Sequence, residues 1–429
     1  MKIAVVGSGI SGLTTAYLLH KEHEVEVFEA NDYIGGHTAT VDIEESDGSS
    51  LAIDTGFIVF NDRTYPRFRH LMRELGVAWQ DAEMSFSVHN PDTGLEYNGH
   101  TLGSMFAQKR NYFRPSFYRM LADILRFNKA AKKALQEEGA ALDERTLDDF
   151  VNELNVGSLF RGNYLYPMCA AIWSASLQEA ARFPLGFFLR FFMNHGLLNV
   201  QDRPQWAVIK GGSRSYIPAL TAGFKDNIYL NCRIQSITRS EQGVQLHLGD
   251  GSIREFDEVV LACHSDQALQ LLADPSEAES GILGAIPYQP NEVVLHTDTN
   301  LLPKRRAAWA SWNYLLPKGE HKTAQLSSVT YDMNILQSLD TKQTYCVTLN
   351  NTAMIDDSKI LRRFVYQHPV YSLQSLAARA RRTEICGQNR THFCGAYWYN
   401  GFHEDGVHSA FDVAHRFNLM PRVAELEQD

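Results

Sequence analysis

The sequence predicts an α/β fold, in which a parallel sheet carries helices and a second domain of mixed helices and strands is built from insertions. Three observations predict it. An apolar strand, a glycine turn and a helix succeed one another at the amino terminus. A further strand and helix pattern follows residue 390. The chain has 429 residues, which is too long for one ordinary core and requires more than one substructure.

The parallel sheet is expected to draw on segments from both ends of the chain. Residues 3–6 are an apolar run that stops at glycines, residues 10–19 have the pattern of a helix, and residues 25–28 that of a second strand. This order is a βαβ unit. Further strand and helix patterns complete the domain at 227–238, 243–248, 256–263, 391–396 and 407–417.

The remaining sequence forms two insertions of different composition. The first is expected to be helical and aromatic-rich, whereas the second contains strand-like runs at 291–298 and 344–350. We therefore predict a discontinuous Rossmann-like domain and an α+β substrate domain formed by the insertions. The first takes residues 1–75, 201–265 and 385–429, and the second takes residues 76–200 and 266–384.

Composition excludes several classes of protein. Fifty acidic against forty basic side chains give a net charge of -10, which argues against a general nucleic-acid binder. No run reaches the roughly 20 apolar residues of a membrane-spanning helix, and the amino terminus lacks a secretory h-region. A cytoplasmic location is therefore expected. The six cysteines contain no C-x-x-C pair, which argues against a disulfide framework and against a metal site.

The first glycine turn has the pattern of a dinucleotide-binding motif. It reads Gly7-Ser8-Gly9-Ile10-Ser11-Gly12 and fits G-x-G-x-x-G, with a strand before it and a helix after it. In such a motif the first glycine allows a tight turn, the second lets a pyrophosphate approach the backbone, and the third permits close helix packing. Glu29 ends the next strand, where a carboxylate accepts hydrogen bonds from a ribose diol. The alternative is a chance glycine turn.

A second glycine pair and two further blocks carry a resemblance. Residues 29–38 have the form E-x5-G-G, residues 54–57 read Asp-Thr-Gly-Phe, and Gly395-Ala396 precedes an acidic start of a helix at 404–410. Together these resemble the FAD-containing amine oxidase superfamily. The resemblance implies bound FAD, in a domain of the amine oxidase or p-hydroxybenzoate hydroxylase type. The expected FAD-binding residues are Gly7, Gly9, Ser11, Gly12, Glu29, Gly35, Gly36, His37, Thr38, Thr55, Gly56, Phe57, Ile234, Gly395, Ala396, Asp405, Gly406 and Val407.

Blocks spread along the whole chain narrow the resemblance. They lie at 167–174, 191–198, 211–213, 309–314, 366–370, 395–399 and 401–406. They resemble a bacterial family of FAD oxidoreductases that includes the methylated unsaturated fatty acid desaturase of furan fatty acid synthesis. The resemblance implies desaturation of a methyl-branched, unsaturated acyl chain of membrane phospholipid, with dioxygen or a partner protein as the electron acceptor.

Candidate catalytic residues follow from flavin chemistry, in which the flavin takes a hydride while a base takes a proton. His195 and His403 are the candidate bases, because the ordinary pKa of histidine, about 6.5, is near the working pH. Tyr397 and Tyr399 stand where the superfamily places aromatic rings beside the flavin. Residues 288–298 contain no lysine, which disfavours amine oxidation, since amine oxidases place a lysine near the flavin.

An aromatic stripe is the candidate lining of a substrate channel. Five phenylalanines between residues 183 and 192 recur at helical spacing, and such a stripe packs either into a core or along an apolar channel. The expected substrate-binding residues are Trp173, Phe187, Phe188, Phe191 and Trp398.

Residues 105–133 reverse the sign of the overall charge. The segment holds eight basic residues against one acid, Asp123, interleaved with aromatic residues. Such a composition suits the inner, anionic face of a cytoplasmic membrane, but equally a solvated helix whose aromatics lie in the core.

Two other functions stay open. One is oxidation of an amine or of an isoprenoid such as a carotenoid precursor. The other is a non-catalytic flavoprotein that delivers lipid to a methyltransferase.

Overall fold

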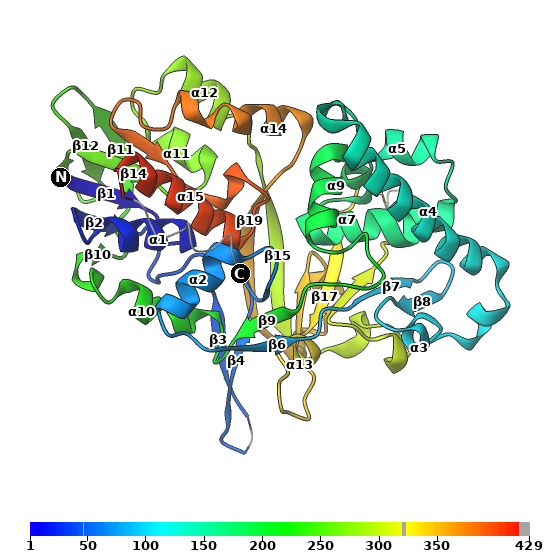
Figure 1. Cartoon of the computed structure of the whole chain (residues 1–429). Helices are drawn as coiled ribbons and strands as arrows, with labels where there is room; N and C mark the ends of the chain where they lie inside the picture. Colours follow the sequence, from blue (N-terminus) through cyan, green and yellow to red (C-terminus); the bar gives the residue numbers. More distant parts are fainter. Residues whose placement is uncertain (46, 320–322, 420–429) are drawn as a thin grey trace. The chain divides into compact units, whose positions relative to one another are not determined.

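The computed structural model describes residues 1–45, 47–319 and 323–419. Within it the chain forms two compact units (Figure 1). Unit 1 contains residues 1–80, 209–288 and 374–429, and unit 2 contains residues 81–208 and 289–373. Residues 266–288, which the sequence analysis placed with the insertions, belong to unit 1. Their helices α11 (Ser265–Leu271) and α12 (Glu277–Leu283) bury Ala268, Ile282 and Leu283 in its hydrophobic core.

The core of unit 1 is a five-stranded parallel sheet in the order β10-β2-β1-β14-β20. Every pair is parallel, so the carboxyl ends of the strands share one edge. The apolar runs are buried, with Ile3, Ala4 and Val5 fully inaccessible to solvent. The strands are β1 (Lys2–Val6), β2 (Glu24–Phe28), β10 (Ile228–Tyr229), β14 (Glu258–Leu261) and β20 (Thr391–Phe393).

Two helices far apart in sequence pack together in unit 1. Helix α1 (Ile10–Leu19) has the bounds that the sequence predicts, and α15 (His403–Arg416) begins four residues before the predicted 407. They lie side by side in Figure 1 and contact each other along their lengths. The rest of unit 1 comprises β3 (Thr40–Glu44), β4 (Ser50–Asp54), α2 (Pro66–Glu74), α10 (Ile217–Thr221), β11 (Ile234–Arg239), β12 (Val244–Leu248) and β13 (Ile253–Phe256).

Unit 2 is built on a mixed seven-stranded sheet in the order β19-β15-β18-β17-β16-β7-β8. Among the described registers, β16 pairs with β7 in parallel, whereas β15 with β18, β18 with β17, β17 with β16 and β7 with β8 are antiparallel. The strands are β7 (Phe86–Asn90), β8 (Leu95–Asn98), β15 (Tyr288–His296), β16 (Trp312–Leu315), β17 (Ser328–Asp332), β18 (Cys346–Leu349) and β19 (Ile360–Pro369).

The first insertion is not purely helical, which corrects one expectation. Its β7 and β8 form a hairpin that joins the sheet of unit 2, because Val88, Leu95 and Tyr97 supply buried side chains to that sheet. Helices follow at α3 (Leu102–Met105), α4 (Pro115–Glu137), α5 (Leu147–Glu153), α7 (Tyr166–Trp173), α8 (Leu177–Ala181) and α9 (Leu185–Asn194). Across the described ranges, no helix has both the length and the hydrophobicity needed to cross a membrane.

Candidate functional site

The turn between β1 and α1 shows why each of its glycines is needed. Gly7 has a φ of +105°, and a Cβ there would lie 2.8 Å from the oxygen of Ala262. A Cβ on Gly12 would lie 1.9 Å from the oxygen of Gly7, so helix and turn can approach only at a glycine. By contrast, a Cβ on Gly9 would meet no atom of the described residues within 4 Å. Gly9 therefore presents open backbone.

The carboxylate of Glu29 is fixed at the end of β2 by both of its oxygens. Oε2 accepts hydrogen bonds from the amide and the hydroxyl of Ser8, at 2.9 and 2.6 Å. Oε1 accepts from the amide and the side chain of Asn31, at 2.9 and 2.8 Å. Sequence reasoning missed Ser8 and Asn31, because neither residue type is required by the motif.

The second glycine pair packs against the first glycine turn. The amide of Gly35 donates to the oxygen of Ser8 at 3.0 Å, and Gly35 and Gly36 have φ angles of +121° and +58°. A Cβ on Gly36 would lie 3.3 Å from the Cα of Gly9. The structure thus brings the two predicted glycine motifs, whose glycines are 23 to 29 residues apart in sequence, into direct contact.

His37 is an uncharged group next to these glycines. Burial and, to a smaller extent, the charge of the neighbouring His264 lower the pKa of its imidazole to about 4. Its backbone oxygen accepts the amide of Phe57 at 2.7 Å. A Cβ on Gly56 would lie 2.2 Å from that oxygen, which explains the glycine in the Asp-Thr-Gly-Phe block. This position therefore offers a neutral hydrogen-bonding group at neutral pH.

Three side chains from distant segments meet at the start of α15. The hydroxyl of Thr38 lies 2.5 Å from that of Tyr216 and 3.0 Å from Nε2 of His403, and Tyr216 lies 3.3 Å from the same nitrogen. The His403 ring stacks on Phe57 with centroids 3.6 Å apart. Burial, followed by the neighbouring His37, holds the pKa of His403 well below its ordinary value. Tyr216 was not predicted, because nothing in its sequence context marks it.

The first turn of α15 is acidic and buried. Asp405 accepts the amide of Phe402 at 2.8 Å, and Glu404 accepts the amide of Phe68 at 2.8 Å and pairs with Arg67. Burial raises the pKa of each carboxyl group to about 7, although these hydrogen bonds oppose the shift. The first turn therefore changes its charge near neutral pH.

Two glycines, Gly406 and Gly395, lie where α15 contacts the rest of the site. A Cβ on Gly406 would lie 2.7 Å from Cγ2 of Ile10 and 2.8 Å from the hydroxyl of Ser11, so the amino-terminal turns of α15 and α1 are in contact. Gly395 donates its amide to Ser409 at 2.9 Å and precedes Ala396 at the end of β20. The buried Val407 completes this junction.

The carboxylate of Asp54, at the end of β4, holds two segments of the site together, although it was not among the predicted site residues. Oδ1 of Asp54 accepts hydrogen bonds from the hydroxyl of Thr40 and from the amide and hydroxyl of Ser213, at 2.6 to 2.8 Å. Burial raises its pKa to about 6 against these bonds. The next residue, Thr55, donates its amide to Ala39 at 2.9 Å. Asp54 thereby joins the Asp-Thr-Gly-Phe block to the Gly211-Gly212-Ser213 block.

The carboxyl-terminal aromatics are part of unit 1 but face different surroundings. Tyr397 and Trp398 lie in its hydrophobic core, which also contains Ile234. Among the described residues, the hydroxyl of Tyr397 and the ring nitrogen of Trp398 are buried without a hydrogen-bond partner. Tyr399 donates to Asp412 at 2.6 Å and stacks on His408. These placements leave the predicted roles of the four residues untested.

The other candidates are in unit 2, where they form an aromatic cluster. Trp173 has Phe183, Phe187, Phe188 and Phe191 within 4.4 to 6.3 Å between ring centroids. A cavity of about 20 Å³ borders Trp173 and Phe183, which is room for about one water molecule. Phe188 is fully buried. In this structure the stripe therefore packs as a core.

His195 ends α9 and is also nearly buried. Its Nδ1 lies 2.9 Å from the oxygen of Phe191, and its ring stacks on that of Phe191 at 3.8 Å. Burial lowers its pKa to about 4. Because a carbonyl can only accept, Nδ1 carries the hydrogen and Nε2 carries the lone pair.

Comparison with known proteins identifies the family. The family described as flavin containing amine oxidoreductase matches residues 10–417. The chain belongs to this family. It is therefore a flavin-containing oxidoreductase, which sets aside the hypothesis of a non-catalytic lipid-delivery protein.

Solved structures of other proteins share the fold. Cyclohexylamine oxidase from Brevibacterium oxydans IH-35A is 16% identical, with a TM-score of 0.67, and the match covers 97% of this chain and 99% of that one. The CLA-producing fatty acid isomerase from P. acnes is 15% identical, with a TM-score of 0.68, and the match covers 97% and 98%. The predicted α/β class, with a parallel flavin-binding sheet and a mixed substrate-domain sheet, is confirmed.

A curated relative matches over a shorter stretch. The 1-hydroxycarotenoid 3,4-desaturase of Flavobacterium sp. (strain P99-3) is 34% identical over 97 residues. That stretch is 22% of this chain and 18% of the relative.

The residues of unit 1 fit the flavin that the family implies. The first-turn amides of α1 have no side-chain cap, and the space in front of Gly9 is open in the described structure. Uncapped amides at a helix amino terminus favour an anionic group. Glu29 stands at the end of the neighbouring strand, and the turn of α15 adjoins that of α1. We conclude that the predicted glycines, Glu29 and the start of α15 form one cradle.

Proposed function

We propose that this chain is an FAD-dependent desaturase that introduces a double bond into a methyl-branched, unsaturated acyl chain of membrane phospholipid. The observation that carries the proposal is the composition of β15. Residues 288–298 contain no lysine, although amine-oxidising members of the superfamily place a lysine there near the flavin. Without that lysine, the flavin chemistry of the family favours a carbon chain over an amine.

Two comparisons support a hydrocarbon substrate. A relative matched at 34% identity is a carotenoid desaturase, and a structure with the same fold over 97% of this chain is a fatty acid isomerase. The sequence blocks shared with the furan fatty acid desaturase family add the methyl branch and the phospholipid to the proposal.

The cradle of unit 1 would hold FAD as a dinucleotide. The backbone at Gly9 and the first-turn amides of α1 would bind the pyrophosphate, and Glu29 would accept hydrogen bonds from a ribose diol. The amino terminus of α15 would favour negative charge on the ring system. When bound, FAD would accept a hydride equivalent from one carbon while the neighbouring carbon loses a proton, and dioxygen or an electron-accepting protein would then reoxidise it.

We propose His403 and His195 as the two candidate proton acceptors. Burial lowers the pKa of both, so both imidazoles are uncharged at neutral pH, and the same shift makes each a weaker base. Nε2 of His403 lies within hydrogen-bond distance of the hydroxyls of Thr38 and Tyr216. Nδ1 of His195 donates to the backbone oxygen of Phe191 at 2.9 Å.

The test uses the protein reconstituted with FAD and mixed without oxygen with phospholipid that carries a methyl-branched monounsaturated chain. We expect bleaching of the oxidised flavin, and a product lighter by two hydrogens on mass spectrometry. The same lipid without its methyl branch, and a simple amine, are the controls. Bleaching by the amine with no change in the lipid would overturn the proposal, as would no reaction with any lipid.

A second candidate function is desaturation of an isoprenoid. The observation that favours it is the match to the carotenoid desaturase. The same assay with a carotenoid precursor in neutral detergent decides between the two, because only one substrate should bleach the flavin at a low micromolar concentration.

A further inference from the structure

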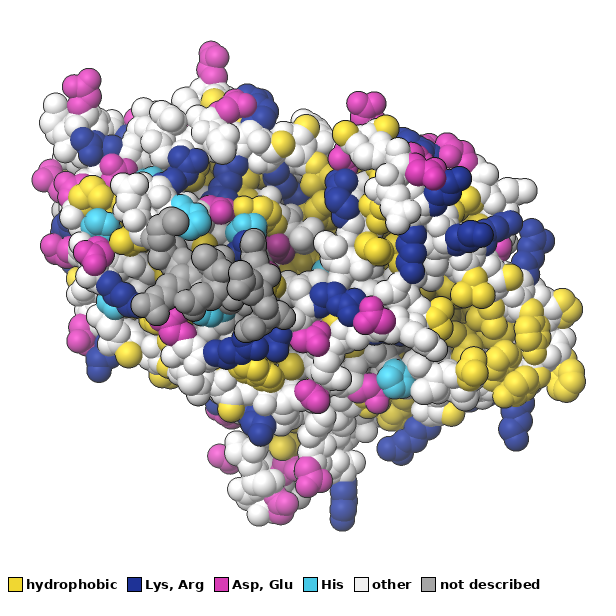
Figure 2. Space-filling model, in the orientation of Figure 1, with side chains coloured by type: hydrophobic (Ala, Val, Ile, Leu, Met, Phe, Trp, Pro, Cys, Tyr) yellow, Lys and Arg dark blue, Asp and Glu magenta, His cyan; other side chains and the backbone are white. Residues whose placement is uncertain are grey.

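One end of unit 2 exposes large apolar side chains. Leu102 and Phe113 are 82% and 88% exposed, Tyr112 and Tyr118 are about half exposed, and Leu125 is 58% exposed. Figure 2 shows hydrophobic side chains gathered at this end, over the region that α3 and the start of α4 occupy in Figure 1. Scattered single apolar residues are normal on a surface, whereas a gathered group indicates a binding surface.

Ring contacts hold these residues together. The ring of Phe106 stacks on Tyr112 with centroids 4.3 Å apart and lies 5.9 Å from that of Tyr118. The hydroxyl of Tyr118 donates to the backbone oxygen of Tyr112 at 3.1 Å. Leu125 follows Tyr118 by seven residues on α4, so both are on one side of the helix. We call Leu102, Tyr112, Phe113, Tyr118 and Leu125 the apolar end.

Basic residues accompany the apolar end, and the one acid of the segment turns away. Lys109, Arg110 and Arg119 are exposed. Asp123 is 4% exposed, and it accepts hydrogen bonds from Arg126 and from the amide of Gly157, both at 2.9 Å. The segment therefore presents no negative charge of its own to solvent, since its single acid is buried and paired with Arg126.

The fold adds basic residues that the sequence analysis did not connect with this segment. Burial is the largest cause of the lowered pKa of Arg110, and the positive charges of Arg114 and Arg305 come next. These three guanidinium groups are therefore neighbours. Lys304, Arg305 and Arg306 are exposed and lie on the loop and short helix that contact β8 and α3. Two parts of unit 2 that are nearly 200 residues apart in sequence thus place positive charges on the same part of its surface.

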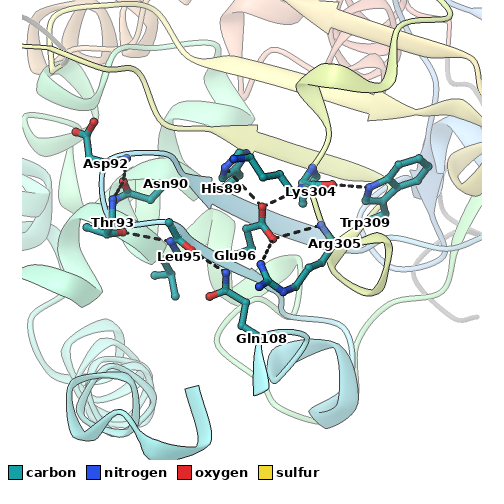
Figure 3. A network of polar contacts seen from close by, with 12 residues as sticks. His89, Asn90, Asp92, Thr93, Leu95, Glu96, Gln108, Lys304, Arg305 and Trp309 are labelled. Carbon is teal, nitrogen blue, oxygen red and sulfur yellow. Dashed lines mark hydrogen bonds and ion pairs between the residues drawn. The ribbon is translucent and has the colours of Figure 1, made fainter. Parts of the chain in front are cut away.

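A buried polar network fixes that loop beneath the surface (Figure 3). Glu96 on β8 is 1% exposed and accepts the amide of Lys304 at 2.8 Å and the guanidinium of Arg305 at 3.0 Å. On the neighbouring turn, Gln108 donates to the oxygen of Gly94 at 2.7 Å, and Arg110 donates to the same oxygen. Because the supports are buried, the surface is preformed.

We propose that the apolar end, with Lys109, Arg110, Arg114 and Arg119, docks this protein on an anionic phospholipid bilayer. Charge complementarity selects this occupant: apolar side chains enter the boundary between headgroups and acyl chains while the basic groups meet lipid phosphates. The surface is contained within unit 2, so this proposal does not depend on the acyl-chain chemistry proposed above.

The experiment measures co-sedimentation of the purified full-length protein with vesicles that contain no methyl-branched lipid. We expect binding to vesicles containing phosphatidylglycerol, weaker binding to pure phosphatidylcholine vesicles, and a decline as salt rises. The double variant Lys109→Gln/Arg114→Gln should lower the partition coefficient by roughly 25-fold, since each basic residue near a lipid surface contributes a factor of about five. The matched control Lys342→Gln/Arg362→Gln, in exposed positions of the same unit, should leave it unchanged.

The apolar contribution has its own pair of variants. Leu102→Ser/Phe113→Ser should weaken binding by roughly tenfold or more at every salt concentration. Met354→Ser/Val365→Ser, which alters residues that are 62% and 63% exposed elsewhere in unit 2, should not. Equal binding to neutral and anionic vesicles would overturn the proposal. Failure to bind either kind of vesicle would also overturn it. If the protein instead forms a concentration-dependent dimer that Phe113→Ser abolishes, the surface is a protein interface and the proposal is wrong.

Discussion

The imidazole of His403 lies flat against the ring of Phe57, with 3.6 Å between centroids and 8° between planes. Nε2 of the same imidazole lies within hydrogen-bond distance of two hydroxyls, those of Thr38 and Tyr216. One side chain thus combines an apolar stack with a polar network, and both are buried. The segment after the second glycine pair, the Asp-Thr-Gly-Phe block and the start of α15 are held together through this residue.

Replacing His403 by phenylalanine should separate these two roles. His403→Phe keeps a ring against Phe57 but leaves two buried hydroxyls without their shared partner, so the free energy of unfolding should fall by ~1–3 kcal/mol. Adding Tyr216→Phe should then cost less than it does in the wild type, because the hydroxyl that it removes has already lost His403 and keeps only Thr38 as a partner. Urea unfolding of both single variants and the double variant measures the coupling. Additive losses would show that the hydrogen bonds contribute nothing.

Gly9 and Gly12 should respond in opposite ways to the same change. Gly9→Ala adds a methyl group where no described atom lies within 4 Å and φ is -68°, so apoprotein stability should stay within about 1 kcal/mol. Flavin affinity, measured by fluorescence titration, should nevertheless fall by tenfold or more, because the methyl group occupies the cofactor space. Gly12→Ala places its Cβ 1.9 Å from a backbone oxygen, so that variant should be destabilised even without flavin. Unimpaired flavin binding by Gly9→Ala would contradict the proposed cradle.

The stability of the apoprotein should depend on pH through Glu404. Burial raises the pKa of this carboxyl from 4.5 to about 7, so the folded state binds the proton more tightly than the unfolded state. Its contribution is therefore full below about pH 4.5 and is lost as the pH rises through about 7. Between pH 5 and 8, wild type should lose ~1–3 kcal/mol of unfolding free energy relative to Glu404→Gln. The exposed control Glu384→Gln should not reproduce this difference in thermal or urea unfolding.

The ion pair between Arg239 and Glu279 should be far more important for stability than a similar pair on the surface. Arg239 makes two hydrogen bonds to Glu279, at 2.6 and 3.0 Å, and both side chains are at most 2% exposed. Arg239→Met leaves a buried carboxylate unpaired, so it should cost ~3–5 kcal/mol of unfolding free energy. Arg381 pairs with Glu384 in the same bidentate manner but is 52% exposed, and Arg381→Met should cost less than about 1 kcal/mol. Similar losses in the two variants would contradict this assignment.

Local patterns in the sequence predicted the elements whose interactions are local. Helix α1 has the predicted bounds, because the apolar run, the glycine turn and the helix pattern all depend on neighbouring residues. The hairpin of β7 and β8 was missed in an insertion expected to be helical, since β7 joins the sheet through β16, whose residues are more than 200 positions away.

The candidate site was predicted in the same uneven way. Gly7, Gly9 and Gly12 follow a fixed spacing, so their roles could be inferred before any coordinates. Arg67 and Tyr216 could not be found, because a hydrogen bond between remote segments leaves no spacing in the sequence. The phenylalanine stripe had a clear period, but a period gives only the shared face of a helix and not what covers it.

By itself, the sequence determined the cofactor-binding topology and the positive segment at 105–133, because a glycine turn and a local charge excess are properties of adjacent residues. Only the tertiary structure decided how those charges and contacts are used. It turned Asp123 inward, brought Arg305 beside Arg110, and gathered Thr38, Tyr216 and His403 around one nitrogen. The physical reason is that burial and pairing depend on which distant side chains fill the same space, and that is settled only when the whole chain packs.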